Sequence, residues 1–194
     1  MKKIGIDLDG VIFDTERYFR FYADIWDIKH HGLDNVVDEK QVRFQERYNW
    51  SKEEIEDFYS SVVFDLEENS GFIPGAKEVL KYLKDQGYEL YIITARGFFS
   101  KKQEEITMRL LKEVNLDIFE EYIFKVKSKK DIILEKNIDY MIEDNIDICK
   151  EIKDICKTIY FKDAYTYELE DKDVYTVLGW HEIYRYFKKI EEEG

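Results

Sequence analysis

The sequence is poor in cysteine, in long apolar runs and in positive charge. Its two cysteines, Cys149 and Cys156, stand at a spacing that matches no metal-binding or redox motif, so we expect small buried thiols in a reducing compartment. No segment approaches the length of a transmembrane helix, and the apolar run after the basic start reaches Asp7 too soon for a signal peptide. The sequence therefore predicts a cytoplasmic protein without a membrane partner.

Negative charge dominates the composition. The 194 residues include 43 Asp and Glu against 30 Lys and Arg, a formal charge of −13. A protein this acidic is poorly suited to gripping a polynucleotide backbone or an anionic membrane, so neither partner is expected. A small phosphorylated substrate remains open, because a few local donors and a metal ion can reverse the field inside one pocket. The composition also leaves a homodimer open.

Short apolar runs alternate with helical patterns along most of the chain. These runs predict strands at residues 3–8, 88–94, 122–126, 140–142, 158–161 and 175–177. Helices are predicted at about residues 74–86, 100–114, 129–136, 145–154 and 180–189. Alternation of this kind predicts an α/β fold, a Rossmann-like parallel sheet with helices on both faces.

Residues 15–70 interrupt the alternation. Aromatic residues recur there at helical spacing with charges between them, and strand patterning is absent. Ser51 and Glu54 form a capping box, in which each side chain satisfies a free backbone N–H at a helix start. We therefore expect three or four helices inserted after the first strand. Residues 1–14 and 71–194 would form the core domain, and residues 15–70 a small helical domain.

Two carboxylates directly follow the first predicted strand. Asp7 and Asp9 would point to opposite faces of a strand, but at its end the loop can turn both toward one pocket. Phosphoryl transfer of this type needs one ionised carboxylate as nucleophile and another that holds a proton for the leaving group. Gly10 then allows the backbone to approach a phosphate closely. Taken alone, these residues are also compatible with a simple acidic turn.

Three further signals lie near the ends of later strands. Thr94 ends the second predicted strand, where its hydroxyl and the next backbone N–H can donate to a phosphate oxygen. Four lysines between residues 125 and 130 precede a helix, and one could neutralise phosphate charge. Glu143 and Asp144 end another apolar run, and Asp144 offers the hard oxygen that suits Mg²⁺. Since open parallel sheets bind ligands at the carboxyl ends of their strands, we expect the four signals to meet.

The order of these signals resembles that of the haloacid dehalogenase phosphatases. The chain carries DxDG, then a Thr, then a Lys, then an acidic pair, and residues 72–80 resemble the helix entry before the second motif of that superfamily. The likeness spans residues 1 to about 160. It implies a phosphomonoester hydrolase that depends on Mg²⁺ and forms an aspartyl-phosphate, with residues 15–70 where helical caps occur.

The resemblance also implies roles for individual residues. Asp7 would be the nucleophile, and Asp9 would protonate the leaving oxygen and then activate water. The implied ligands of Mg²⁺ are the carboxylates of Asp7 and Asp144 and the backbone carbonyl of Asp9. Lys129 best matches the third motif, with Lys127 and Lys130 as alternatives. The residues expected at the substrate are Gly10, Val11, Thr94, Ala95, Arg96 and Lys129, although a surface role for Arg96 is equally compatible with the sequence.

Within the superfamily, the chain most resembles the 5′(3′)-deoxyribonucleotidases of the cytosolic type and their bacterial relatives. It has Val11 where most members have Thr, a short helical insertion, and an acidic pair in place of Gly-Asp. This implies a nucleoside monophosphate substrate, with Trp26, Tyr48 and Trp50 as candidates for stacking on a base. The same aromatics could instead be the core of the insertion. The alternatives are a sugar phosphate or other small phosphorylated metabolite, and a non-catalytic binding protein of the same fold.

Overall fold

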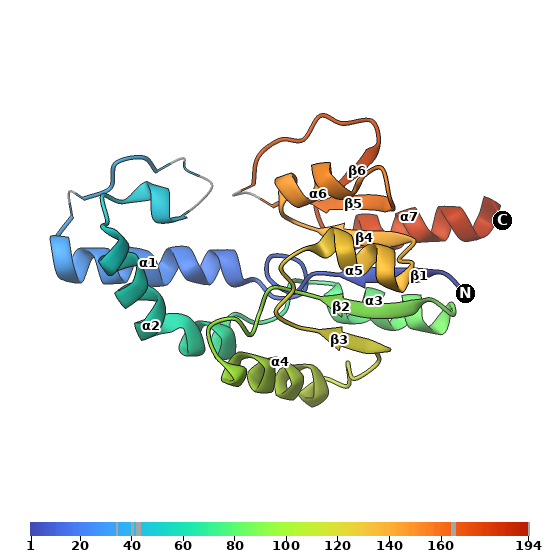
Figure 1. Cartoon of the computed structure of the whole chain (residues 1–194), viewed down its shortest axis with the longest axis horizontal. Helices are drawn as coiled ribbons and strands as arrows, with labels where there is room; N and C mark the ends of the chain where they lie inside the picture. The colour runs from blue at the N-terminus through green and yellow to red at the C-terminus, as the bar shows by residue number, and fades with distance from the viewer. Residues whose placement is uncertain (34, 40, 42–43, 164–165, 194) are drawn as a thin grey trace.

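The computed structural model describes residues 1–33, 35–39, 41, 44–163 and 166–193. Its centre is a six-stranded parallel sheet with the order β3-β2-β1-β4-β5-β6 (Figure 1). The strands are β1 (Lys3–Ile6), β2 (Glu89–Ile93), β3 (Glu121–Ile123), β4 (Tyr140–Glu143), β5 (Lys157–Phe161) and β6 (Val174–Val177). All six lie close to the predicted positions, because short apolar runs buried on both faces are the sequence pattern of a parallel sheet.

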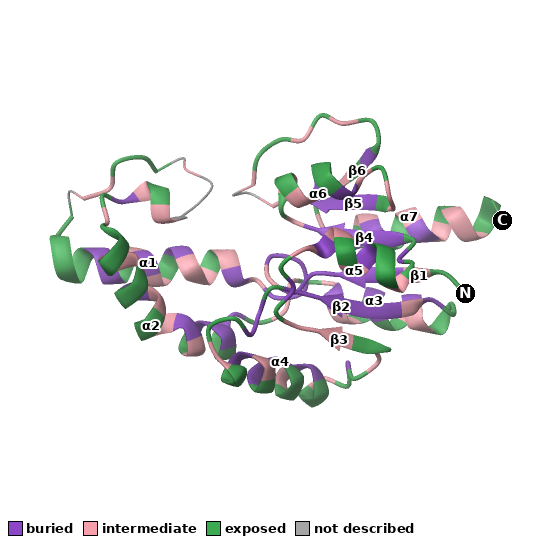
Figure 2. Ribbon diagram, in the orientation of Figure 1, coloured by how far each residue is buried: buried purple, intermediate pink, exposed green. Residues whose placement is uncertain are grey.

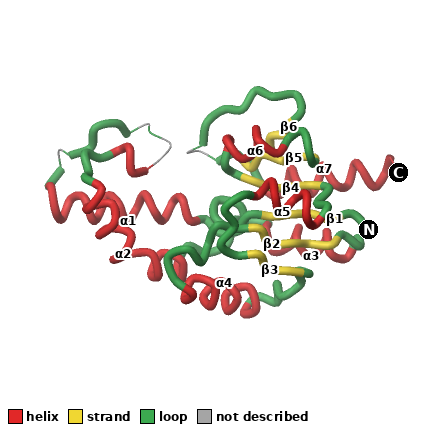
Figure 3. Tube along the Cα trace, in the orientation of Figure 1, coloured by secondary structure: helices red, strands yellow, loops and turns green. Residues whose placement is uncertain are grey.

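Helices cover both faces of the sheet, as Figure 3 shows. The helices are α3 (Ala76–Asp85), α4 (Lys101–Glu113), α5 (Lys129–Lys136), α6 (Ile146–Ile152) and α7 (Trp180–Glu193). Ile92 and Ile142 pack with residues of α3, α4 and α7, whereas the alternate strand residues Ile93 and Met141 pack with residues of α5 and α6. Side chains of successive strand residues point to opposite faces, so both faces carry apolar cores. This arrangement confirms the predicted α/β fold (Figure 2).

A helical insertion, residues 15–70, connects β1 to the segment before α3. It contains α1 (Thr15–His31), the short 3₁₀ helix η1 (Phe44–Arg47) and α2 (Lys52–Asn69). The capping box at the start of α2 is present: Ser51 Oγ accepts from the Glu54 N–H at 3.2 Å and Glu54 Oε2 accepts from the Ser51 N–H at 2.7 Å. Among the described residues, the insertion has two α-helices and one 3₁₀ helix, which agrees with the expected three or four helices. In the stretches between these helices, Tyr48 pairs with Val36 in an isolated antiparallel bridge.

The parallel arrangement determines where the functional residues meet. The carboxyl ends of all strands lie at the same edge of the sheet (Figure 1). The loops after β1 and β2 line a cavity at this edge together with α1 and α2. Within the part of the chain that the structure describes, no helix is both long enough and apolar enough to cross a membrane.

Candidate active site

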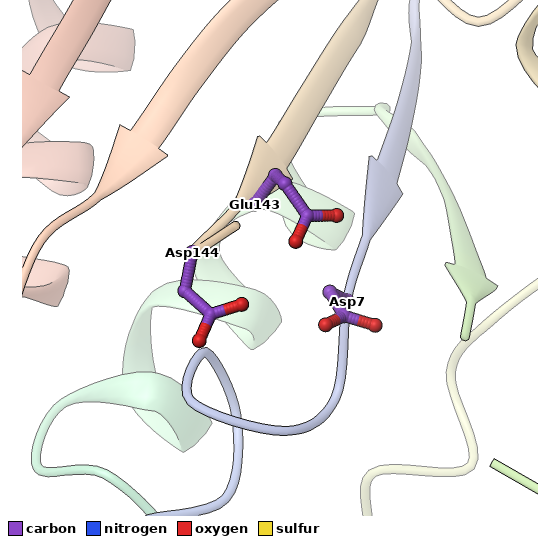
Figure 4. A group of neighbouring side chains, drawn as sticks. All are labelled: Asp7, Glu143 and Asp144. Carbon is purple, nitrogen blue, oxygen red and sulfur yellow. The ribbon is translucent and has the colours of Figure 1, made fainter. Parts of the chain in front are cut away.

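Three acidic side chains converge at the carboxyl ends of the two central strands. Asp7 follows β1 and stays within the sheet's bonding pattern, because its N–H donates to the Ile142 carbonyl of β4 at 3.0 Å. Glu143 is the last residue of β4, and Asp144 comes next. One carboxylate oxygen from each of the three lies within 4.8 Å of the others (Figure 4). Adjacent parallel strands therefore bring together residues more than 130 positions apart.

Lys129 connects two of these carboxylates. Its Nζ lies 2.9 Å from Asp7 Oδ1 and 2.5 Å from Glu143 Oε2. The second oxygen of Glu143, Oε1, accepts the backbone N–H of Asn145 at 2.9 Å. Both oxygens of Glu143 therefore have donors, so this residue is suited to hold Lys129 in place, while Asp7 and Asp144 complete the carboxylate cluster.

The start of α5 explains why Lys129 is the lysine at the site. Ser128 caps the helix, its Oγ accepting from the Asp131 N–H at 3.2 Å, and Lys129 is the first helical residue, only 7% exposed. Lys127 is exposed and Lys130 is partly exposed. Of the lysines that the sequence left as alternatives, Lys129 is the one that the structure brings into contact with Asp7.

Burial and mutual repulsion perturb the charges of this cluster. Burial raises the pKa of Asp7, and the Glu143 and Asp9 charges raise it further, against the opposing charge of Lys129. Burial, Glu143 and Asp7 together raise the pKa of Asp144 in the same way. For Lys129, burial lowers the pKa, but the charges of Asp7 and Glu143 outweigh burial and the pKa is raised. Three carboxylates against one ammonium leave two excess negative charges, the charge that a divalent cation would neutralise.

The donor set fits Mg²⁺ rather than a softer metal. The converging ligand atoms are all carboxylate oxygens, with no His or Cys among them in the described chain. Mg²⁺ prefers hard oxygen ligands and takes only one or two carboxylates from the protein. Asp7 and Asp144 can supply these two, since both oxygens of Glu143 are already bonded.

Gly10 allows the loop after β1 to pass close to Asp144. Its φ is +71°, and a Cβ added there would lie 2.1 Å from Asp144 Oδ2. Its N–H donates inside the loop, to the Phe13 carbonyl at 2.9 Å and to Thr15 Oγ1 at 3.1 Å. The next residue, Val11, is fully buried, and its carbonyl accepts from Trp180 Nε1 at 2.8 Å. These contacts hold the loop in shape, while a contact of Gly10 or Val11 with phosphate stays a prediction.

Arg96 is bonded to Asp9. Its Nε lies 2.9 Å from Oδ2 and its Nη2 lies 2.7 Å from Oδ1 of Asp9, a two-point contact, while Nη1 donates to Thr107 Oγ1 at 2.9 Å. The guanidinium also lies 4.7 Å from the ring centre of Phe13. Burial acts to raise the pKa of Asp9, but the charge and hydrogen bonds of Arg96 outweigh it and lower the pKa. Arg96 is 4% exposed, so it is not the surface residue that the sequence also allowed.

Thr94 and Ala95 lie where β2 ends. Thr94 is 1% exposed, and its Oγ1 accepts the backbone N–H of Arg96 at 3.2 Å, which leaves the hydroxyl hydrogen to donate elsewhere. Ala95 is exposed and borders a cavity that also contains Asp9. The structure therefore brings Thr94, Ala95 and Arg96 to the same edge as Asp9, with Arg96 directed to the carboxylate.

A cavity of about 490 Å³ lies between the helical insertion and the carboxyl ends of the strands. Its lining is mainly apolar and aromatic. The residues around it are Asp9, Phe19, Tyr59, Val63, Leu66, Glu67, Ala95, Arg96, Phe98, Phe99 and Gln103. Pockets that combine apolar walls with a few polar groups are typical of small-molecule sites. We call this space the aromatic cavity.

The aromatics that the sequence offered for stacking are not those that line this cavity. Trp26 is 7% exposed and Tyr48 is 4% exposed, and both pack with Phe58 in the core of the insertion. Trp50 joins the same cluster, stacked on Tyr48 with ring centres 4.6 Å apart. For these three residues the structure supports the interpretation that they form the insertion's own core. Helical spacing shows that residues share a face of a helix, but it does not show what that face packs against.

Glu143 and Glu67 are polar residues of the site to which sequence reasoning gave no role. Glu143 stood in the acidic pair at a strand end, which was a usable signal, but its pairing with Lys129 depends on tertiary structure. Glu67 is one of many acids on an amphipathic helix and carried no signal, although it is buried at the aromatic cavity.

The geometry agrees with comparisons to known proteins. Residues 1–147 match the family described as haloacid dehalogenase-like hydrolase. The chain belongs to this family. Among its relatives is a "Putative nucleotidase" of Oceanobacillus iheyensis, 26% identical over 191 residues that cover 94% of this chain and 97% of that one. A "Putative nucleotidase" of Bacillus cereus is 29% identical over 73% of this chain and 76% of its own.

Solved structures of this family have the same fold. A haloacid dehalogenase-like family hydrolase from Streptococcus pneumoniae superposes with a TM-score of 0.67 at 15% identity, covering 96% of this chain and 98% of its own. The prediction of an α/β hydrolase of the haloacid dehalogenase superfamily is therefore confirmed.

Proposed function

We propose that this hydrolase cleaves phosphate monoesters, and that its substrates are nucleoside monophosphates. The observation that carries the proposal is the position of Lys129, bonded to Asp7 and Glu143 within the carboxylate cluster that Asp144 completes. Asp9, two residues after Asp7, borders the aromatic cavity. Family membership and the names of the two relatives support a phosphoric monoester hydrolase.

In the proposed reaction, Asp7 is the nucleophile. Its carboxylate attacks phosphorus, an aspartyl-phosphate forms, and the bond from phosphorus to the leaving oxygen breaks. Lys129 is within reach of both Asp7 and the phosphate, so it offsets negative charge as the transition state forms. Thr94 supplies a hydroxyl for a phosphate oxygen. Water then attacks the phosphorus of the intermediate, which releases inorganic phosphate and restores Asp7.

Asp9 is the proton-transfer residue of this proposal. It gives a proton to the leaving oxygen in the first half of the reaction and takes one from water in the second. The contact with Arg96 lowers the pKa of Asp9 and favours its ionised form, which is the form needed to accept a proton from water. This contact therefore supports the second half of the proposed reaction.

We assign the metal to Asp7, Asp144 and the backbone carbonyl of Asp9. The excess negative charge of the carboxylate cluster and its all-oxygen donors support Mg²⁺. When bound, such an ion supplies charge neutralisation for the phosphate and a fixed orientation toward the nucleophile. Lys129 and Glu143 then complete the charge balance of the site.

The aromatic cavity supports the proposal of a substrate with a flat apolar body, whose leaving oxygen would lie at Asp9. Phe19, Tyr59, Phe98 and Phe99 border it, and stacking of a base on an aromatic side chain contributes about 1–3 kcal/mol in nucleic-acid complexes. Because α1 and α2 provide one wall, we also propose that residues 15–70 form a cap that excludes water from the site.

A panel of monophosphates tests this function. Phosphate release would be measured with Mg²⁺ for deoxyuridine and thymidine monophosphate, for sugar phosphates and for p-nitrophenyl phosphate. Nucleotides should give the highest kcat/KM, and Asp7→Asn should abolish turnover and the trapping of a beryllium fluoride adduct. If sugar phosphates are hydrolysed faster than every nucleotide, the nucleotide assignment is wrong. Near wild-type activity of Asp7→Asn would refute the mechanism itself.

A further inference from the structure

Glu67 is a buried carboxylate at the wall of the aromatic cavity, and only one of its oxygens is hydrogen-bonded within the described part of the chain. It lies on α2 of the helical insertion and is 4% exposed. Its Oε1 accepts from Gln103 Nε2 at 2.5 Å. Its Oε2 is buried and has no hydrogen-bond partner among the residues that the structure describes. Buried polar atoms almost always have a partner, so an unpartnered carboxylate oxygen at a cavity needs an explanation.

The orientation of Gln103 determines which carboxylate oxygen of Glu67 is hydrogen-bonded. The Gln103 Oε1 accepts three backbone N–H groups, those of Gly97 at 3.2 Å, Phe99 at 3.1 Å and Ser100 at 3.3 Å. Its amide can therefore not be reversed without breaking all three bonds, and its NH₂ group must face Glu67. The same bonds hold the loop that carries Phe99, a residue of the cavity wall. One side chain thus orients both the carboxylate and part of the aromatic wall.

We infer that Glu67 Oε2 accepts a hydrogen bond from an N–H on the planar ring of the substrate's leaving group. This rests on the proposed function and extends it, because it names the ring edge that the site selects. Asp9 and Glu67 border the same cavity, so a substrate whose leaving oxygen lies at Asp9 can extend its ring between Phe19, Tyr59 and Phe99 toward Glu67.

The chemistry of the cavity favours a ring N–H over other partners. An ionised carboxylate only accepts hydrogen bonds, so the ligand atom facing Oε2 must be a donor. The walls are aromatic and aliphatic, which suits a flat ring rather than a sugar covered with hydroxyl groups. The imide N–H of a pyrimidine such as thymine meets both conditions.

Methylation of that N–H provides the test. Thymidine monophosphate and its N3-methyl analogue would be assayed with wild-type protein and with Glu67→Gln. For wild-type protein, the kcat/KM for thymidine monophosphate should be about 10–100-fold higher than that for the N3-methyl analogue, the range expected for a hydrogen bond to a charged group. In Glu67→Gln the ratio should fall to near 1. The new amide must present its carbonyl to Gln103 and its NH₂ group to the ring, so it cannot accept.

The neighbouring residue provides a matched control. Glu68 is on the same helix, is half exposed and pairs with Arg109 rather than with the cavity. Glu68→Gln should therefore keep the wild-type ratio. Since the readout is a ratio of two substrates in one protein sample, partial unfolding of a variant lowers both rates equally and leaves the ratio unchanged.

The outcomes separate this inference from the proposed function. If wild-type protein hydrolyses nucleotides but Glu67→Gln keeps the wild-type ratio, the role of Glu67 is refuted while the function stands. If wild-type protein does not discriminate against the methylated substrate, the ring N–H is not recognised and the inference is wrong. If no nucleotide is hydrolysed, the proposed function fails first. A preference for sugar phosphates that Glu67→Gln abolishes would show that the donor is a hydroxyl group, which also overturns the ring assignment.

Discussion

Replacement of Gly10 by alanine should weaken metal binding much more than it weakens the fold. The φ of Gly10 is +71°, a backbone conformation that costs an L-residue roughly 1–2 kcal/mol. For a chain of this size, each kcal/mol of lost stability lowers Tm by about 2–4 °C. In addition, the new Cβ would start 2.1 Å from Asp144 Oδ2, whereas an ordinary contact needs at least 3.4 Å. The carboxylate would therefore have to move by about 3.4 − 2.1 = 1.3 Å.

A shift of that size should impair the site because Asp144 is a proposed metal ligand. Misplacement of a reacting or coordinating group by 1 Å can cost on the order of 10²-fold in rate. Loss of a supporting partner around a metal typically costs about 10–100-fold in affinity. We therefore expect Gly10→Ala to raise the Mg²⁺ concentration for half activity by about 10–100-fold.

Gly71 separates backbone strain from the clash with Asp144. Its φ is +68°, almost that of Gly10, yet no atom lies within 4 Å of the place where its Cβ would stand. Gly71→Ala should therefore lower Tm by a similar strain contribution and leave the Mg²⁺ requirement unchanged. The assay is phosphate release against Mg²⁺ concentration, together with thermal unfolding of both variants. Equal Mg²⁺ requirements in the two variants would refute the argument that Gly10 makes room for Asp144.

Four further results are expected. Lys129→Ala should lower kcat by about 10²–10³-fold, the size seen when one charge-stabilising donor is removed, with a smaller effect on KM. Lys127 is exposed, so the kcat of Lys127→Ala should stay within about twofold of the wild-type value. Equal effects of the two substitutions would show that Lys129 is not the charge-stabilising lysine. Chelation with EDTA should abolish activity, and added Mg²⁺ should restore it; full activity in excess EDTA would exclude the proposed metal. Arg96→Lys should lower kcat by about 10-fold or more, because an ammonium cannot reproduce the two-point contact with Asp9; unchanged kcat would show that this contact is dispensable. Glu67→Gln should be more stable than wild type at neutral pH, because burial raises the pKa of Glu67 and its ionisation opposes folding. A carboxyl whose pKa is raised in the folded state stabilises the fold at acidic pH, and this stabilisation is lost as the pH rises. The stability advantage of Glu67→Gln over wild type should therefore vanish at acidic pH. An advantage that does not depend on pH would contradict this prediction.

The sequence by itself determined the order of the strands and helices and the chemistry at the strand ends. Apolar runs, helix caps and turns are local signals, so the six strands and the capping box at Ser51 could be predicted from neighbouring residues alone. The convergence of Asp7 with Asp144 also followed, because parallel strands place their carboxyl ends at one edge. Four ordered motifs were enough for the superfamily, which the match over residues 1–147 confirms.

Tertiary structure decided the partners of individual side chains. The sequence left Lys127, Lys129 and Lys130 open, and only the packing of α5 against the sheet buries Lys129 beside Asp7. Helical spacing predicted that the aromatics of residues 15–70 share faces, but not whether a face meets the cavity or its own core, so the sequence left both environments open for Trp26, which packs in the core of the insertion. The pairing of Asp9 with Arg96 and the hydrogen bond between Gln103 and Glu67 join residues from separate elements. Such contacts depend on distances across the folded chain, which a local pattern does not contain.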